Sequence, residues 1–257
     1  MKFGTIASGS SGNCLYAGNE DTNILIDAGV SCKRICEGLK EFEIEGNNIQ
    51  GILITHEHTD HIAGIGVLSR KFHIPIYGTE KTLKQISEME NLGKIERELF
   101  LPIEAGKTFE LGSMSVESFS VSHDAVDPVS YIVRSDKKKL GMVTDLGYYD
   151  DAIVERLKDS NLLYVEANHD IHMLQAGPYP YYLKRRIMGD RGHLCNEVSA
   201  KLVSELVNDG LGQIILGHLS RENNDPELAL ATVKNELEEC FKVRVAPREQ
   251  AGPLFIL

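Results

Sequence analysis

Three histidines and one aspartate share one short stretch of the sequence, Thr55-His56-Glu57-His58-Thr59-Asp60-His61. The apolar residues 52–54 before it predict a buried strand. Beyond it, apolar side chains recur at helical spacing through residues 62–72, which predicts a helix. We therefore expect the chemically active side chains on a strand-to-helix loop, where rigid scaffolds commonly present functional groups.

The types and spacing of these donors predict a site for two metal ions. His56 and His58 are two residues apart, so both side chains can point the same way at the end of a strand. Asp60 and His61 follow at the start of the helix. Four donors in one short loop are too crowded for one tetrahedral ion, but they suit two adjacent ions that take further ligands from elsewhere. Nitrogen and carboxylate donors together favour Zn, Mn or Fe over Ca or Mg.

The pattern His-x-His-x-Asp-His resembles the signature of the metallo-β-lactamase superfamily, an α/β fold built as a four-layer αββα sandwich. Other strand ends in this sequence match the remaining motifs of that superfamily. The resemblance implies one metal site formed by His56, His58 and His123, and a second formed by Asp60, His61 and His218, with Asp145 bridging both. Aspartate at position 145, where β-lactamases would have cysteine, favours the glyoxalase and nuclease branches.

The resemblance also implies a reaction. Two ions would hold a bridging hydroxide that attacks phosphorus or a carbonyl carbon, so the chain would need no covalent nucleophile of its own. The implied catalytic residues are Asp60, Asp145 and His193. Asp27, at a strand end before a helix, is implied to orient the metal loop by hydrogen bonds, although a helix cap fits its position nearly as well.

Composition limits the class of protein. The 257 residues carry a net charge of −11, which counts mildly against nucleic acid, since phosphate binding usually leaves a basic footprint. The five cysteines show no paired spacing, and no apolar run resembles a signal peptide or a membrane span. We therefore expect a cytoplasmic protein with reduced thiols and no membrane partner. No linker is evident, so we expect one domain over residues 1–257, with an active-site insertion at about 168–195.

The hydrophobic pattern predicts strands and helices in two similar series, with every metal candidate at a strand end. Strands are expected near residues 3–8, 14–17, 23–26, 52–54, 75–78, 109–111, 114–121, 130–133, 140–143, 162–165, 213–216, 241–245 and 254–257. Helices are expected near residues 31–41, 62–72, 80–89, 150–158, 196–208 and 226–237. Residues 95–121 are predicted to be antiparallel strands, and residues 171–192 to be irregular.

Substrate contacts are expected from two regions. The small, hydroxyl-rich loop at residues 8–13 can face a phosphate, which makes Ser8, Ser10, Ser11 and Asn13 candidates, although a simple tight turn fits it fairly. Residues 166–196 resemble a variant of the tRNA 3′-processing nuclease pattern, in which the second histidine contacts the scissile phosphate. That resemblance implies such a role for His193. Further substrate-contact candidates in this region are His169, Lys184, Arg185, Arg186 and Asn196; a basic run beside tyrosines suits a nucleic-acid surface, although a solvated face is about as plausible.

Several of these stretches together resemble the YycJ (WalJ) family of metallo-β-lactamase-fold proteins. The matching stretches span the chain: residues 8–13, 55–61, 168–170, 179–187, 192–194 and 217–224. The resemblance implies a metal-dependent 5′-to-3′ exonuclease on double-stranded DNA. Cys195 stands where serine is expected in many relatives, which weakens any polar role for that side chain.

Three alternatives remain open from the sequence. A phosphodiesterase for a small cyclic or nucleotide substrate is favoured by the acidic charge. A thioesterase of the glyoxalase type shares the pattern from Thr55 to Gly64. A metal-binding regulatory module without catalysis is disfavoured because all seven implied ligands are intact. The sequence leaves the oligomeric state open.

Overall fold

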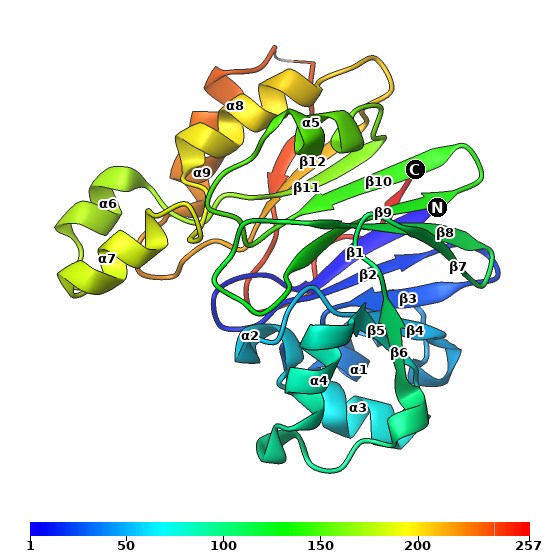
Figure 1. Cartoon of the computed structure of the whole chain (residues 1–257). Helices are drawn as coiled ribbons and strands as arrows, with labels where there is room; N and C mark the ends of the chain where they lie inside the picture. The colour runs from blue at the N-terminus through cyan, green and yellow to red at the C-terminus, as the bar shows by residue number, and fades with distance from the viewer. Residues whose placement is uncertain (239) are drawn as a thin grey trace. The chain divides into compact units, whose positions relative to one another are not determined.

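The computed structural model describes residues 1–238 and 240–257 (Figure 1). These residues form two compact units. Unit 1 contains Met1–Ser120, Ala125–Lys137 and Pro247–Leu257; unit 2 contains Val121–Asp124 and Lys138–Ala246. No helix of these residues combines the length and hydropathy that crossing a membrane requires. All five cysteines are free thiols, in agreement with the sequence prediction.

Unit 1 is built on a mixed seven-stranded sheet. In sheet order its strands are β14 Phe255–Ile256, β1 Lys2–Ala7, β2 Cys14–Gly18, β3 Asn23–Ile26, β4 Gly51–Leu53, β5 Ile76–Thr79 and β6 Phe100–Ile103. The first four strands pair antiparallel, and β3 to β6 pair in parallel. Parallel pairing brings the carboxyl ends of β3 and β4 to the same edge. Asp27 follows β3 there, and the metal loop follows β4.

Both faces of this sheet are covered within unit 1. The helices are α1 Cys32–Glu41, α2 Thr59–Ile62, α3 Ile65–Phe72 and α4 Glu80–Ser87, with short 3-10 turns η1 Gly46–Asn48, η2 Glu90–Leu92 and η3 Arg97–Leu99. Their apolar faces join one buried cluster with the strands, in which Ile35 and Leu68 pack with Ile52. The antiparallel strands β7 Thr108–Leu111, β8 Met114–Ser120 and β9 Val129–Ser135 supply a second layer. The hydroxyl of buried Tyr131 in β9 donates to the carbonyl oxygen of Ile54 at 2.6 Å, joining that layer to the strand before the metal loop.

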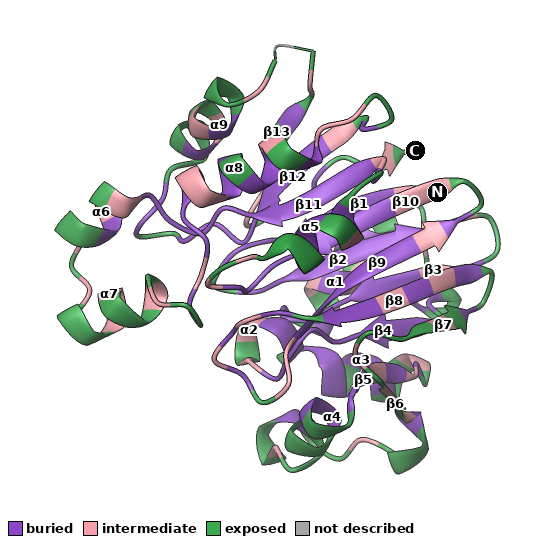
Figure 2. Cartoon of the chain, turned by 45° about the horizontal axis from the view of Figure 1, so that its top comes forward, coloured by how far each residue is buried: buried purple, intermediate pink, exposed green. Residues whose placement is uncertain are grey.

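Unit 2 has a parallel sheet with helices around it. The strands, in sheet order, are β13 Val243–Val245, β12 Gln213–Gly217, β11 Leu162–Glu166 and β10 Lys138–Val143. The helices are α5 Asp151–Leu157, α6 Ile171–Ala176, α7 Tyr181–Ile187, α8 Asn196–Leu206 and α9 Pro226–Asn235. The sheet strands are largely buried, whereas α6 and α7 are mostly exposed (Figure 2). Because the strands are parallel, their carboxyl ends present Asp145, Glu166 and His218 along one edge.

Most predicted elements are present, and their caps follow from the sequence. Thr79 caps α4 by accepting from the backbone N–H of Thr82, and Asp225 caps α9 directly before its first-turn proline. The expected helix behind the metal loop is divided into α2 and α3, because Gly64 donates its N–H to the carbonyl oxygen of Ala28. A methyl group on Gly64 would lie 2.0 Å from the carbonyl oxygen of Val30, so this close crossing requires glycine.

Two secondary-structure predictions were wrong. Residues 171–192 are not irregular, since they contain α6 and α7. The sequence gives no signal for these helices, because α7 buries no side chain and α6 buries only Leu174, so neither has an apolar stripe. Within residues 95–121, only β7 and β8 form the expected antiparallel hairpin; β6 pairs in parallel with β5.

Candidate metal and catalytic site

The metal loop lies at the carboxyl end of β4 in unit 1. His58 has extended backbone angles and is the N-cap of α2, so Asp60 and His61 fall in the first turn of that helix. His56 and His61 are fully buried, and their ring centroids are 4.2 Å apart. The centroid of His58 lies 4.5 Å from that of His56. The loop thus gathers three imidazoles, as its spacing predicts.

Asp27 fixes the orientation of His61. Its carboxylate accepts from the backbone N–H of Thr55 at 2.9 Å and from Nδ1 of His61 at 2.7 Å. A carboxylate only accepts, so His61 carries its hydrogen on Nδ1 and its Nε2 is left with a lone pair for a metal. Burial raises the pKa of Asp27, while the attraction of His61 and these hydrogen bonds lower it. This geometry supports an orienting role for Asp27.

The loop at residues 8–13 braces the metal loop. The backbone N–H of Asn13 donates to the carbonyl oxygen of Asp60 at 2.7 Å, and the side chain of Asn13 bonds both backbone groups of Gly9. Asn13 and Ser8 are buried, whereas Ser10 and Ser11 are exposed. Of the four predicted phosphate contacts, the two exposed serines are therefore the ones most accessible to a substrate.

Gly29 should tolerate no side chain, because it lies directly against the metal loop. A methyl group there would lie 1.7 Å from the carbonyl oxygen of Asp60 and 2.7 Å from the backbone nitrogen of Asn13. We expect Gly29→Ala to lower the Tm by about 2–12 °C, the range that an overpacking cost of ~1–3 kcal/mol gives. Calorimetry checks this, with Gly212→Ala as control, where the nearest atom to an added methyl group is 3.6 Å away. Equal melting of the two variants would contradict the prediction.

Unit 2 gathers a second set of candidates around Glu166, a fully buried residue at the end of β11. One carboxylate oxygen accepts from Nδ1 of His193 at 2.7 Å and from Nδ1 of His218 at 2.8 Å. The other accepts from the backbone N–H groups of Leu146 and Leu194. Burial alone would raise the pKa of Glu166, but attraction to and hydrogen bonds from the two histidines hold it well below its usual range.

These contacts decide which atoms of the cluster can bind metal. One donor atom each from Asp145, Glu166, His193 and His218 lies within 4.8 Å of the others. Glu166 already accepts four N–H groups, so we read it as the residue that orients the histidines, with Asp145 and His218 as ligands. Oδ1 of Asp145 lies 3.4 Å from the His218 ring. Both His193 and His218 are fixed with Nδ1 protonated, which leaves Nε2 of each ring for a metal or a substrate oxygen.

His123 is placed similarly at the start of unit 2. Its Nδ1 donates to the carbonyl oxygen of Gly192 at 3.1 Å, and its Nε2 lies 3.9 Å from Oδ1 of Asp145. Burial lowers the pKa of His123, which favours the neutral imidazole that a metal requires.

Three candidate residues share an uncommon backbone conformation. Asp27, Asp145 and His218 have φ angles of 62°, 56° and 54°, in the left-handed region that non-glycine residues rarely adopt. Asp27 follows β3 in unit 1, and Asp145 and His218 follow β10 and β12 in unit 2. Such strain concentrates at functional sites, where the surrounding structure holds it in place.

The predicted substrate residues between positions 184 and 196 differ in what they can reach. Lys184 donates from Nζ to the carbonyl oxygens of Gln175 and Gly177, both at 2.7 Å, so it braces the turn between α6 and α7. The guanidinium of Arg186 bonds the carboxylate of Asp124. Arg185 is exposed. Asn196 is fully buried and exchanges side-chain hydrogen bonds with Asn224, so it would have to break them to touch a substrate.

His169 is buried, and its Nδ1 has no hydrogen-bond partner among the described residues. Burial lowers the pKa of His169 from 6.5 to about 4. Between pH 6.5 and 4 the ring therefore binds a proton in the unfolded chain but not in the folded chain. The free energy of unfolding should fall as the pH drops through this range. Between pH 7.5 and 5, we expect the free energy of unfolding of the native protein to fall by about 2 kcal/mol more than that of His169→Phe. Urea unfolding of chelated protein at both pH values measures this.

The exposed His172 offers the control for that experiment. His172→Gln should keep the full pH dependence, because folding does not bury the ring of His172. If His169→Phe keeps it as well, the burial of His169 does not govern the acid sensitivity.

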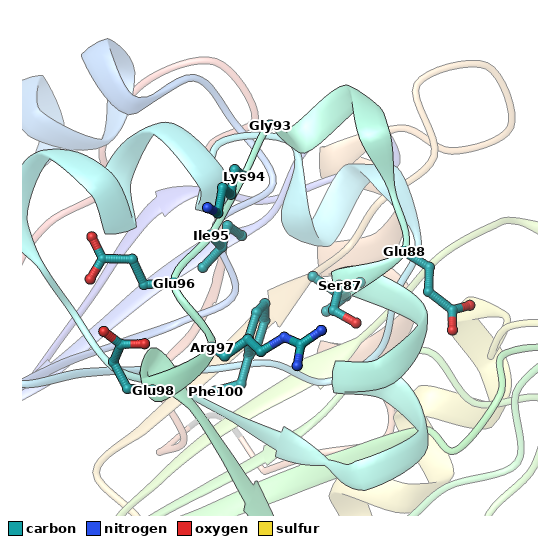
Figure 3. A pocket seen from close by; sticks show the side chains of 10 residues that line it. Ser87, Glu88, Gly93, Lys94, Ile95, Glu96, Arg97, Glu98 and Phe100 are labelled. Atoms are coloured by element: carbon teal, nitrogen blue, oxygen red, sulfur yellow. The ribbon is translucent and has the colours of Figure 1, made fainter.

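Unit 1 also contains an open pocket of about 720 Å³ between α4 and β6 (Figure 3). Its lining mixes acidic and basic side chains, among them Glu96, Glu98, Lys94 and Arg97. No candidate metal or substrate residue lines it, and we assign it no role.

The sequence analysis missed Glu166 as a functional residue. Residues 166–196 were predicted to resemble a nuclease pattern, but the carboxylate of Glu166 was given no role. The available signal was that a strand of apolar residues ends in a buried charge, which is costly unless the charge is paired. Arg191 was also missed; it donates from Nε and Nη2 to the carbonyl oxygen of His123, at 3.1 and 3.0 Å.

Comparison with known proteins places this geometry in a family. Residues 22–206 match the family model of the beta-lactamase superfamily domain. The chain is 41% identical over 239 residues to Exodeoxyribonuclease YycJ of Bacillus anthracis, covering 93% of this chain and 90% of that protein. It is 40% identical to Exodeoxyribonuclease WalJ of Streptococcus pneumoniae, covering 99% and 97%. The metallo-beta-lactamase fold protein YhfI of Bacillus subtilis superimposes with a TM-score of 0.75 at 16% identity, over 99% of both chains.

The fold and the histidine–aspartate sets define a domain of the metallo-β-lactamase superfamily, which confirms the predicted αββα fold class. Within this superfamily, the chain belongs to the YycJ/WalJ family. The donor sets fit divalent metal, since neutral imidazoles and carboxylates converge at strand ends and carboxylates hold two of the candidate ligands in their metal-binding tautomer.

Proposed function

We propose that this protein is a metal-dependent exodeoxyribonuclease that degrades duplex DNA from its 5′ ends. The observation that carries the proposal is the arrangement around Glu166, which orients His193 and His218 beside Asp145. The relatives named exodeoxyribonuclease, at 40–41% identity over nearly the whole chain, support DNA as the substrate. A cytoplasmic location remains part of the proposal.

Two divalent ions, Zn, Mn or Fe, are proposed as the cofactor. His56, His58 and His123 would bind one ion, and Asp60, His61 and His218 the other, with Asp145 shared between them. When bound, the ions supply positive charge that activates water and stabilises the oxygens of the reacting phosphate. Asp27 and Glu166 would keep His61 and His218 in the tautomer that binding requires.

His193 is proposed to act directly on the substrate. Glu166 holds its Nδ1, so Nε2 is the atom that can contact a phosphate oxygen or deliver a proton to the leaving oxygen. The side chain of His193 is 19% exposed, whereas that of His218 is 2% exposed, which is consistent with one ring facing substrate and the other facing metal. Arg185 and the exposed serines 10 and 11 remain proposed contacts to the DNA backbone. Ser8, Asn13, His169, Lys184, Arg186 and Asn196, which are buried or bonded within the protein, are proposed to hold these contacts in place.

A competition experiment tests the substrate class. The metal-loaded protein is assayed on the small diester bis(4-nitrophenyl) phosphate with increasing 5′-phosphorylated duplex DNA. If DNA is the substrate, it should inhibit hydrolysis of the small diester and be degraded itself. The acidic net charge of −11 favours the alternative, a small nucleotide or cyclic diester. Hydrolysis that excess DNA leaves unchanged would support that alternative.

A further inference from the structure

Helices α6 and α7 form a projecting arm in unit 2, which we define as residues 171–191. Both helices lie together at one end of this unit, away from α5, α8 and α9 (Figures 1 and 2). The arm contributes almost nothing to a core, because α7 buries no side chain and α6 only one. Packing usually supplies most of the stability of a short helix. Because the arm packs so little, we infer that its surface serves an interaction with another molecule.

The outer surface of the arm is aromatic and basic. Tyr181 and Tyr182 are each 74% exposed, and Met188 is 42% exposed. These three are among nine large apolar side chains exposed in the described residues, and they lie within eight positions of one another. Residues 171–191 contain four arginines and lysines against one aspartate, a net +3 in a chain of net −11. Clustered exposed apolar groups of this kind mark interaction sites.

The base of the arm is fastened to the candidate active site. The guanidinium of Arg186 bonds Asp124, and Arg191 donates twice to the carbonyl oxygen of His123. Ser122 donates from Oγ to the carbonyl oxygen of Asp190 at 2.7 Å. A molecule held by the arm would therefore be held at a fixed position relative to His123.

Tyr181 and Tyr182 are the side chains of the arm that are best placed to contact a bound molecule. Lys184, Arg186 and Arg191 are engaged within the unit, whereas both tyrosines present their rings outward beside exposed Arg185. Aromatic rings stack on any accessible nucleobase face without reading sequence. The end of a duplex, where an exonuclease acts, offers such a face at every step of degradation. The chain has a net charge of −11, so its long-range electrostatic attraction to DNA is weak. Stacking requires no net positive charge and can supply affinity in its place.

We propose that Tyr181 and Tyr182 form a stacking platform for nucleobases of the DNA substrate, with Arg185 contacting an adjacent phosphate. This inference rests on the proposed function and identifies α7 as the element that binds the DNA substrate. It predicts two separable signatures. Loss of the rings should weaken binding at every salt concentration, whereas loss of Arg185 should reduce the salt dependence of binding by about one phosphate contact.

The test measures binding of a fluorescent 5′-phosphorylated duplex by anisotropy, in an Asp145→Asn background that should prevent cleavage. The combined Tyr181→Ala and Tyr182→Ala variant should bind about 5- to 150-fold more weakly with an unchanged salt slope. The corresponding Phe variant should bind as tightly as the parent, because its rings still stack. Leu228→Ala, which removes an exposed apolar side chain from α9, should have no effect.

Hydrolysis of bis(4-nitrophenyl) phosphate by the same arm variants, made in the otherwise native chain, shows whether the site is intact. This activity should be unchanged, because the substitutions remove only exposed side chains of α7. If native protein degrades DNA but the alanine pair binds it normally, the arm proposal alone is overturned. If native protein hydrolyses the small diester but neither binds nor degrades DNA, the proposed function fails as well. A changed oligomeric state with unchanged DNA affinity would make the arm a protein interface and overturn the proposal.

Discussion

Asp145→Asn should lower the rate of DNA cleavage by at least about 10³-fold, which corresponds to the loss of ~4 kcal/mol of transition-state stabilisation by metal. Asparagine has the shape of aspartate and tolerates the left-handed backbone that Asp145 adopts at φ 56°, so the change removes charge with little strain. Asp145 lies beside both His218 and His123, and its carboxylate is the negative charge proposed to hold the ions. Initial rates on duplex DNA and metal analysis of the purified protein measure the effect.

Asp159→Asn provides the matched control. Asp159 is an exposed residue of unit 2 with φ 57°, so the same substitution is made in the same backbone conformation away from the histidines. The control should keep full activity and full metal content. If Asp145→Asn binds two ions and cleaves DNA at a rate near that of the native protein, the proposed bridging role is wrong.

Glu166→Gln should lower cleavage by about 10²- to 10³-fold, because one carboxylate orients two histidines, and loss of a residue that orients a ligand typically costs 10- to 100-fold. The glutamate accepts four N–H groups, and the amide nitrogen of glutamine cannot accept any. At least one histidine or backbone N–H would therefore face another donor. We expect weaker metal binding through His218 and slower proton delivery through His193.

The two consequences can be separated experimentally. Excess metal should restore the occupancy of Glu166→Gln, measured by equilibrium dialysis, while its turnover on DNA stays low because His193 is still misoriented. Glu155→Gln, at a surface position paired with Lys158, should behave as the native protein does. Recovery of full turnover by metal alone would show that Glu166 acts on His218 and not on His193.

Much of the site was predictable because its residues occupy strand ends. His56 follows the apolar run of β4 in unit 1. Asp145 and His218 follow apolar runs in unit 2, where the parallel strands of one sheet bring their carboxyl ends to one edge. The donor types then indicate metal, and the family match confirms the fold class. The succession of strands along the chain follows from the local hydrophobic pattern. The caps at Thr79 and Asp225 follow from side chains that can accept from the first N–H groups of a helix.

What the sequence could not predict depends on contacts distant in the chain. The role of Glu166 arises only when His193 and His218, 27 and 52 positions away, are brought to the same oxygen of its carboxylate. Helices α6 and α7 have no apolar stripe to detect, since almost nothing in them is buried. Lys184 looked like a phosphate contact, but the structure shows its ammonium bonded to carbonyl oxygens of the neighbouring turn.

The most direct test of the account follows the fate of a DNA duplex that carries 5′ phosphates and an internal label. The native protein is stripped with chelator and then supplied with Mn or Zn before the products are resolved by length. We predict no cleavage without metal and, once metal is restored, stepwise loss of nucleotides from the 5′ end. Cleavage that survives complete removal of metal, or a metal-loaded protein that leaves the duplex intact, would contradict the account.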